Sequence, residues 1–176
     1  EAINRRHESG RNWEARDFTM YLTTTNAMAR DINAARLLRL NTKSYSFRSR
    51  IHGRFDEKSL PTDAELSLKI GAQIMLLNND SSGRWINGTV GEVVAVETAD
   101  DGGETEIIVE LPSKERVAVT PYRWDMYEFR YDRSSRQIES DSVGSFTQYP
   151  MKLAWAVTIH KSQGKTFDRV IVDIGR

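Results

Sequence analysis

The feature that most constrains the fold is a dense series of short apolar segments in the middle of the chain. From Leu66 to Phe146, runs of apolar residues are separated by turn signals such as Asn87-Gly88, a pair that tolerates positive φ. About six short strands within roughly eighty residues favour a small antiparallel barrel. A sheet of that size must close or be covered, because open strand edges invite aggregation. We therefore expect an all-β module at residues 66–148.

The residues before this module have the pattern of an α/β layer. Residues 20–24 form a short apolar run that predicts a buried strand, and the apolar spacing from Asn26 to Leu40 predicts a helix. Thr25 or Asn26 can cap that helix, since each side chain offers an oxygen to free backbone amides. A strand, a polar turn and a helix in that order are typical of an α/β domain.

The α/β pattern returns after Pro150. Residues 153–163 show helical spacing, and Gly164 could end this helix in a left-handed conformation. Residues 167–174 form an apolar run that predicts a strand. The simplest interpretation is an α/β domain with a small all-β barrel inserted in one of its loops.

These patterns divide the chain into three parts. Residues 1–65 are expected to hold the first part of the α/β domain, including a polar connector with one short strand at 45–47. The inserted module follows at residues 66–148, and residues 149–176 return to the α/β domain. The chain opens on Glu1 and ends directly after an apolar run, so we expect it to be a piece of a longer protein.

Composition excludes several classes of protein. The 176 residues include no cysteine, which rules out disulfides and thiolate metal sites and favours an intracellular origin. The three histidines are scattered and no apolar run could span a bilayer, so neither a metal centre nor a membrane segment is expected. The net charge is zero, yet residues 30–58 carry eight Lys or Arg against three acids, and residues 91–115 carry eight acids against one lysine. These are either two solvated faces or one face that attracts phosphates and one that repels them.

The stretch HKSQGKTF at residues 160–167 ends like a phosphate-binding P-loop, in which backbone amides and a lysine hold nucleotide phosphates. A P-loop also requires a glycine five residues before its Gly-Lys pair and a helix after it. Ile159 occupies the position of that glycine, and a predicted strand follows. The stretch is therefore not a P-loop.

Three segments instead resemble superfamily 1 DNA helicases of the RecD-like and PIF-type branch. TIHKSQGKTFDRVIVD (158–173) is similar to motif V of that branch, and MYLTTTNAMARDIN (20–33) is similar to its motif IV. LKIGAQIMLLNNDSSGRWINGTVGEVV (68–94) resembles the opening of its SH3-like inserted barrel. YPMKLAWAVTIHKSQG (149–164) resembles the return into the second RecA-like domain. The resemblance covers nearly everything from Met20 onward.

The resemblance implies a partial RecA-like domain that carries an SH3-like antiparallel barrel. It implies an ATP-dependent DNA helicase that translocates on single-stranded DNA and unwinds duplex, with roles in DNA repair or recombination inside the cell, in a bacterial-type cytoplasm or nucleoid. ATP and Mg²⁺, single-stranded and fork DNA, and the first RecA-like domain of the same chain would be its cofactors and partners. Neither the P-loop domain nor motif VI with its arginine finger is present, so this segment alone is expected to be inactive.

The resemblance also implies which side chains act. The DNA-binding set offers hydroxyl, amide, imidazole and ammonium donors, which suit phosphate contacts. Its members are Thr24, Thr25, Asn26, Thr158, His160 and Lys161. The set on the nucleotide side of motif V is Gln163, Gly164 and Thr166. One short segment could thus sense both ligands and couple ATP hydrolysis to movement along DNA.

Several alternatives stay open. His160 could simply satisfy a backbone carbonyl at a helix end, and Lys165 is expected to be a solvated lysine. Trp85 and Trp124 could stack on a base or pack across the barrel. The alternative function, from another class, is a non-catalytic module that binds nucleic acid or protein through the barrel. A parent protein that lacks an ATP-binding half would favour that function.

Overall fold

A three-stranded parallel sheet forms the α/β part of the molecule. The computed structural model describes residues 18–56, 60–98, 103–132, 136–167 and 169–172. Strand β1 (Thr19–Thr23) lies between β12 (Ala156–Thr158) and β13 (Arg169–Val172), and both neighbours run parallel to it. The predicted first strand is confirmed, and β13 falls within the predicted run 167–174.

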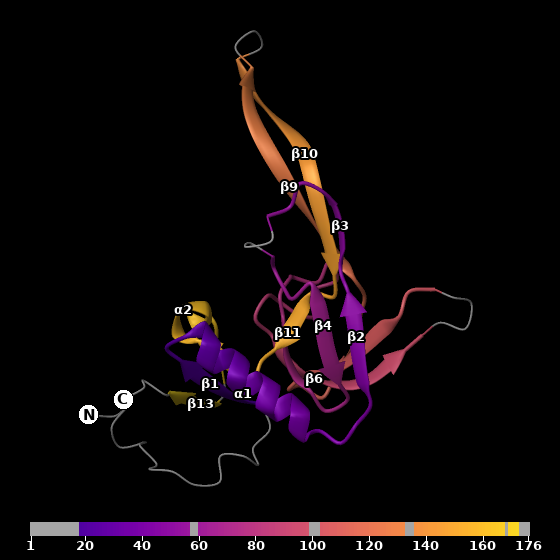
Figure 1. Ribbon diagram of the computed structural model, residues 1–176, viewed down its shortest axis with the longest axis vertical. Coiled ribbons are helices and arrows are strands. Elements are labelled where there is room, and N and C mark those ends of the chain that lie inside the picture. Colours follow the sequence, from indigo (N-terminus) through magenta and orange to yellow (C-terminus); the bar gives the residue numbers. More distant parts are fainter. Residues whose placement is uncertain (1–17, 57–59, 99–102, 133–135, 168, 173–176) are drawn as a thin grey trace.

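Helix α1 (Asn26–Arg39) covers one face of this sheet (Figure 1). The predicted helix and cap are confirmed, since Thr25 is the N-cap and its Oγ1 accepts a hydrogen bond from the Met28 backbone N–H at 3.2 Å. Ala29 packs between Tyr21 of β1 and Ala156 of β12. Contacts among these three side chains hold the start of α1 against the sheet.

The amide of Asn33 fastens α1 to β12. Its Nδ2 donates to the Ala156 carbonyl at 2.9 Å, and its Oδ1 accepts from the Ala156 N–H at 2.8 Å. A side-chain amide that pairs with both backbone groups of one residue substitutes for a missing strand neighbour. The helix and the strand are therefore fixed to each other by polar as well as apolar contacts.

The predicted helix at 153–163 is wrong over most of its length. The chain forms β11 (Met151–Leu153), then β12, and only then the short helix α2 (Ile159–Ser162). A short apolar run can be a buried strand or a buried helix, and periodicity alone does not separate the two. Here pairing with β1 decides for the strand. Gly164 has φ of +72°, so the predicted left-handed residue is confirmed.

The middle of the chain forms a five-stranded antiparallel sheet in the order β11-β5-β6-β7-β8. Its bounds after β11 are β5 (Gln73–Leu76), β6 (Val90–Glu97), β7 (Glu106–Glu110) and β8 (Arg116–Val119). A separate antiparallel pair is formed by β2 (Ser44–Arg48) and β4 (Glu65–Lys69). The predicted turn at Asn87-Gly88 is confirmed, with φ of +102° at the glycine.

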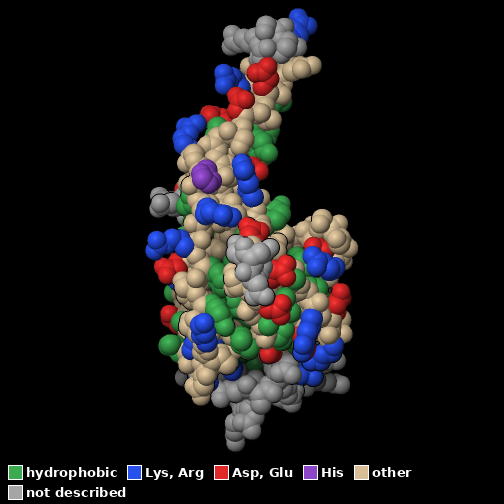
Figure 2. Space-filling view, turned by 90° about the vertical axis from the view of Figure 1, so that its right-hand side faces the viewer, with side chains coloured by type: hydrophobic (Ala, Val, Ile, Leu, Met, Phe, Trp, Pro, Cys, Tyr) green, Lys and Arg blue, Asp and Glu red, His purple; other side chains and the backbone are tan. Residues whose placement is uncertain are grey.

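A third sheet extends away from the rest of the molecule. Its order is β3-β10-β9, with β3 (Arg50–Gly53), β9 (Tyr122–Asp132) and β10 (Gln137–Gln148). Beyond the end of β3, β9 and β10 continue as a two-stranded ribbon, which we call the arm (residues 127–131 and 137–142) (Figure 1). Figure 2 shows charged side chains of both signs along the arm.

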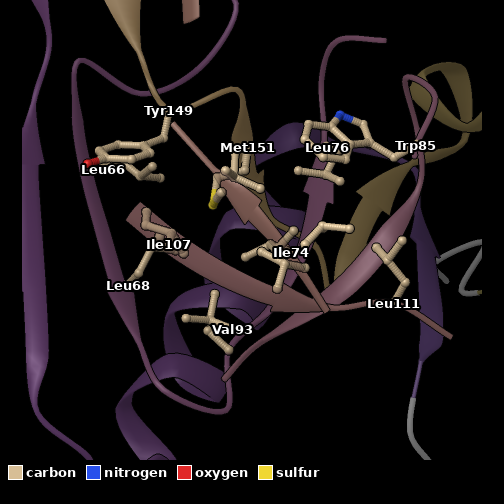
Figure 3. Packing of buried hydrophobic residues seen from close by; sticks show 14 residues of the cluster. Leu66, Leu68, Ile74, Leu76, Trp85, Val93, Ile107, Leu111, Tyr149 and Met151 are labelled. Carbon is tan, nitrogen blue, oxygen red and sulfur yellow. The ribbon is translucent and has the colours of Figure 1, made fainter. Parts of the chain in front are cut away.

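The five-stranded sheet and the β2–β4 pair enclose one apolar core (Figure 3). Leu66 and Leu68 point into it from β4, Ile74 and Leu76 from β5, and Val93 from β6. All five side chains are fully buried. This burial is the main stabilising contribution in the middle of the chain.

The predicted SH3-like barrel is not confirmed. Within the described residues the strands form no closed barrel, because β11 and β8 are the edges of the five-stranded sheet and the β2–β4 pair does not join it by hydrogen bonds. One face of the sheet is instead covered by the β2–β4 pair, with which it encloses the apolar core. Leu37 of α1 and Leu40, the C-cap residue, are partly buried and pack against this core.

The pairing also bears on the limits of the inserted module. The predicted connector 41–65 holds two strands, where the sequence indicated one. β2 pairs with β4, β3 pairs with β10, and β11 pairs with β5. Strand partners of the module therefore extend on both sides of the predicted range 66–148, which stays a prediction.

None of the helices in the described ranges is long and apolar enough to cross a membrane.

Candidate nucleic-acid interface

Two segments that are far apart in the sequence meet at one edge of the parallel sheet. Thr23, the last residue of β1, pairs with Thr158, the last residue of β12. The Thr23 hydroxyl donates to the Thr25 carbonyl at 3.0 Å and lies 3.5 Å from the Val157 carbonyl. Because the strands are parallel and adjacent, the segments that follow them leave the sheet at the same edge. Carboxyl edges of parallel sheets are where α/β domains bind ligands.

The structure brings the predicted DNA-binding residues together at this edge. Five of the six are exposed: Thr24, Thr25, Asn26, His160 and Lys161. Thr158 is the exception, since it is only 6% exposed. The hydroxyl of Thr158 is therefore poorly placed for direct contact with a ligand, and its neighbours provide the accessible donors.

The start of α1 adds a favourable electrostatic field. The helix has 14 residues, its first turn contains no acidic side chain, and it begins three residues after Thr23, the end of β1. A helix N-terminus of this kind attracts anions and can donate to phosphate oxygens. The exposed hydroxyl and amide side chains beside it extend the same donor surface.

Helix α2 sets the orientation of the motif V segment. The Ser162 hydroxyl donates to the Ile159 carbonyl at 2.6 Å, and the Lys165 N–H donates to the Ser162 carbonyl at 3.1 Å. These bonds form a tight turn whose outer side carries His160 and Lys161. The predicted nucleotide-side residues follow on the same loop and are all exposed: Gln163, Gly164 and Thr166.

Lys165 is not the solvated lysine that the sequence suggested. Its Nζ donates to Asn87 Oδ1 at 3.2 Å, so the motif V loop is hydrogen-bonded to the tight turn of the inserted module. Burial lowers the pKa of Lys165. The sequence offered no signal for this contact, since the two residues are 78 positions apart.

Lys152 has no role in the sequence analysis, and the structure gives it an altered pKa. It lies in β11, is partly buried, and has a pKa lowered to about 8. Burial is the largest cause, followed by repulsion from Lys161 and Lys165, while Asp63 acts in the opposite direction.

Of the two tryptophans left open by the sequence, Trp85 is a packing residue. Trp85 is buried, its indole N–H donates to Asn78 Oδ1 at 3.1 Å, and the guanidinium of Arg84 lies 4.7 Å from the ring centre. Trp124 contacts the rings of Tyr122 and Phe146. Stacking on a base would require a free ring face, which Trp85 does not offer.

Comparison with known proteins agrees with this geometry. No family model matches the chain. An ATP-dependent DNA helicase Pif1 from Psychrobacter sp. (strain PRwf-1) is 31% identical over 196 residues, which cover 88% of this chain and 30% of that protein. The Campylobacter jejuni ATP-dependent DNA helicase Pif1 is 30% identical over 168 residues, which cover 90% of this chain and 36% of that protein.

Solved structures give the same answer. Unliganded Pif1 from Bacteroides sp. matches with a TM-score of 0.80 and 32% identity, over 91% of this chain and 35% of that chain. The chain belongs to the Pif1-type family of DNA helicases. It spans about a third of the length of the Pif1 relatives that it matches.

Two further solved Pif1 structures concern DNA binding or unwinding. Bacteroides Pif1 bound to single-stranded DNA matches with a TM-score of 0.74 and 32% identity, over 93% of this chain and 36% of that chain. A structure that describes unwinding of forked duplex DNA by two coordinating Pif1 helicases matches with a TM-score of 0.67 and 32% identity, over 91% of this chain and 34% of that chain.

Proposed function

We propose that this chain is the second motor segment of an ATP-dependent DNA helicase and that the edge formed by β1 and β12 grips single-stranded DNA. The observation that carries the proposal is the meeting of two donor-bearing segments, after Thr23 and after Thr158, at one edge of a parallel sheet. Membership of the Pif1-type family supports it, because the relatives are named as helicases and one is described with single-stranded DNA. Fork DNA would be the substrate of the whole protein.

DNA phosphates would be held by side chains that read no base. His160 and Lys161 are exposed on α2, and Thr24, Thr25 and Asn26 are exposed at the start of α1. Hydroxyl, imidazole and ammonium groups contact phosphates without distinguishing sequences, which suits a motor that moves along any strand. Thr158 would act through its backbone and through the position of its neighbours, because its side chain is buried.

The nucleotide would lie on the other side of the same loop. Gln163, Gly164 and Thr166 are exposed and offer neutral amide, backbone and hydroxyl donors for ATP. They are a poor fit for Mg²⁺, since the described residues contain no cluster of acidic or histidine side chains that could hold a metal ion. We propose that the first RecA-like domain of the parent chain supplies the magnesium ligands, and that this segment alone does not hydrolyse ATP.

The module inserted in this domain would be built from residues between Ser44 and Leu153, because strands over that range pair with one another. Its SH3-like character and the limits 66–148 come from the resemblance. Roles in DNA repair or recombination inside the cell rest on the same basis.

Replacement of His160 by alanine in the full-length parent tests the grip. A hydrogen bond to a charged group contributes about 1.5–3 kcal/mol, so we expect DNA-stimulated ATPase activity to require at least about tenfold more single-stranded DNA. Affinity for ATP without DNA should stay unchanged. The matched control is His52→Ala, because His52 is also an exposed histidine but lies in β3.

Unchanged stimulation of His160→Ala by single-stranded DNA would contradict the assignment of α2 to the DNA grip. An equal loss in His52→Ala would show that the effect is not specific to the sheet edge. A full-length parent that binds DNA without any ATPase activity would favour the alternative, a non-catalytic binding module.

A further inference from the structure

The motif V loop (residues 163–167) is attached to the inserted module at two of its residues. Lys165 Nζ donates to Asn87 Oδ1 at 3.2 Å. Phe167 is partly buried and packs against the buried cluster that contains Met75 of β5. Thr166 lies between these two residues in the sequence, and its side chain is exposed. The module therefore holds the residues on both sides of Thr166 and leaves that side chain accessible.

The first half of the loop has little packing of its own. Gln163 is exposed, and a Cβ added to Gly164 would meet no atom within 4 Å. The Lys165 N–H donates to the Ser162 carbonyl at 3.1 Å, which closes the turn after α2 without connecting it to another part of the chain. Side-chain contacts of Lys165 therefore restrain this half of the loop relative to the module.

The acceptor on the module is held in place independently of motif V. The Asn87 N–H donates to Asn79 Oδ1 at 2.8 Å, and the Gly88 N–H donates to the Leu76 carbonyl at 2.8 Å. Both bonds lie within the segment that leads from β5 to β6. Because they fix the backbone at Asn87, its amide oxygen is presented to the lysine in a defined position.

Gly88 provides the space that the lysine side chain occupies. A Cβ on Gly88 would lie 2.6 Å from Lys165 Nζ, 3.0 Å from Cδ and 3.2 Å from Cγ. These distances are shorter than ordinary van der Waals contact, so a larger residue would push the lysine off the turn. Gly88 also has φ of +102°, which glycine adopts without steric cost. The turn is thus shaped so that Lys165 lies across it and reaches Asn87.

We propose that Asn87 is a positioning residue for ATP hydrolysis, which acts through Lys165 on the nucleotide side of the motif V loop. The inference rests on the proposed function, since it requires that Gln163, Gly164 and Thr166 face the nucleotide. Groups that stabilise a transition state must be placed closely, and a displacement of about 1 Å can lower a rate by about 100-fold. The inserted module would then be needed for ATP turnover although Asn87 itself does not contact the nucleotide.

The test compares the steady-state ATPase kinetics of the full-length parent and its Asn87→Ala variant at saturating single-stranded DNA. Asn87 has no positive φ, so alanine fits its backbone and the turn should persist. The kcat should fall by about tenfold, the effect of losing a hydrogen bond to a charged group. The KM for ATP and the Kd for single-stranded DNA should change by less than about twofold, because the lost interaction acts only in the transition state.

The matched control for this variant is Asn41→Ala. Asn41 is also an exposed asparagine, but it lies in the loop between α1 and β2. Its replacement should leave kcat, KM and Kd at their wild-type values.

Two further variants separate positioning from a structural role. Asn87→Asp keeps an oxygen acceptor for the Lys165 ammonium, so it should restore most of the wild-type kcat. Lys165→Ala should lower kcat about as much as Asn87→Ala does. The double variant should lose no more than Lys165→Ala alone, because both substitutions remove the same contact.

Each outcome bears on a different statement. If Asn87→Ala keeps the wild-type kcat, or if its loss adds to that of Lys165→Ala, the positioning role is wrong while the proposed helicase function stands. If Asn87→Ala weakens binding of single-stranded DNA and leaves the kcat at saturation unchanged, the turn acts on DNA and the inference is overturned. If the wild-type parent has no ATPase activity that single-stranded DNA stimulates, the proposed function itself fails.

Discussion

Strand β10 belongs to two regions of different character. Residues 144–147 pair with β3, and the ring of Phe146 is fully buried, whereas residues 137–142 form the arm with β9 and are all exposed. Both halves are strand and both pair with β9, with a register shift between Ser142 and Gly144. The difference shows that strand formation and burial are separate properties. Alternation and β-propensity specify the strand, and only contact with other elements specifies what it buries.

The arm sorts its side chains by face even though it buries neither face. Tyr131 pairs with Ile138, and Phe129 pairs with Ser140, so uncharged residues share one face. The opposite face carries charges, and Arg130 Nη2 lies 3.2 Å from Asp141 Oδ2. Residues 127, 129, 131 and 138 supply four of the exposed large hydrophobic side chains of the described chain. The arm therefore depends on cross-strand pairs, while the interior depends on burial.

The largest expected effect comes from two phenylalanines on paired strands. Phe146→Ala should lower the free energy of unfolding by about 3–5 kcal/mol, because a fully buried ring leaves a cavity. Phe129→Ala is the matched control, since this ring is 71% exposed, and the expected change is below about 0.5 kcal/mol. Urea denaturation measures both. Equal losses of stability in the two variants would contradict the distinction between the buried part of β10 and the exposed arm.

A smaller effect should mark the boundary between them. Gly144 pairs with Gly53 at the end of β3, and a Cβ on Gly144 would overlap the Arg54 carbonyl. Gly144→Ala should therefore cost about 1–3 kcal/mol through forced displacement of the backbone. Gly83→Ala is the control, because its Cβ would meet nothing within 4 Å, although φ of +75° still costs about 1 kcal/mol. If Gly144→Ala destabilises the protein no more than Gly83→Ala does, the boundary between the two regions does not lie at Gly144.

The smallest effect compares two Arg–Asp pairs. In the inserted module, Arg84 donates to both carboxylate oxygens of Asp80 at 2.8 and 2.9 Å, and this carboxylate is 7% exposed. Hydrogen bonds from the Arg84 side chain, followed by those from backbone N–H groups, lower the pKa of Asp80 to about 2. The pair in the arm, Arg130 and Asp141, is 75% and 66% exposed.

The pH dependence of Asp80 follows from the sign of its shift. A lowered pKa means that the carboxylate stabilises the folded state above its ordinary value of 3.8, and that this contribution is lost as the pH falls to about 2. Asp80→Asn should therefore lower the Tm at pH 7, and the difference from wild type should disappear near pH 2. Asp141→Asn is the control and should change stability by less than about 1 kcal/mol at pH 7. A difference in Tm for Asp80→Asn that persists at pH 2 would contradict the assignment.

The sequence predicted well where a feature depends on near neighbours. Thr25 caps α1 as expected, since the acceptor and the donor are three residues apart. Asn87-Gly88 forms the expected turn, in which Gly88 has positive φ, because glycine adopts that conformation readily. The strands near Leu66, Ile107 and Arg116 also lie where alternation predicted them. These features require only local geometry and the separation of apolar from polar side chains.

The sequence determined local structure, chain order and the residues that resemble helicase motifs. Tertiary structure alone decided that 156–158 is a strand rather than a helix, that the module stays open, and that Lys165 bonds to Asn87. Thr23 and Val157 are 134 positions apart and become neighbours only when packing selects one register. Partners at such distances are chosen by the shape and burial of whole elements, and no short stretch of sequence encodes that choice.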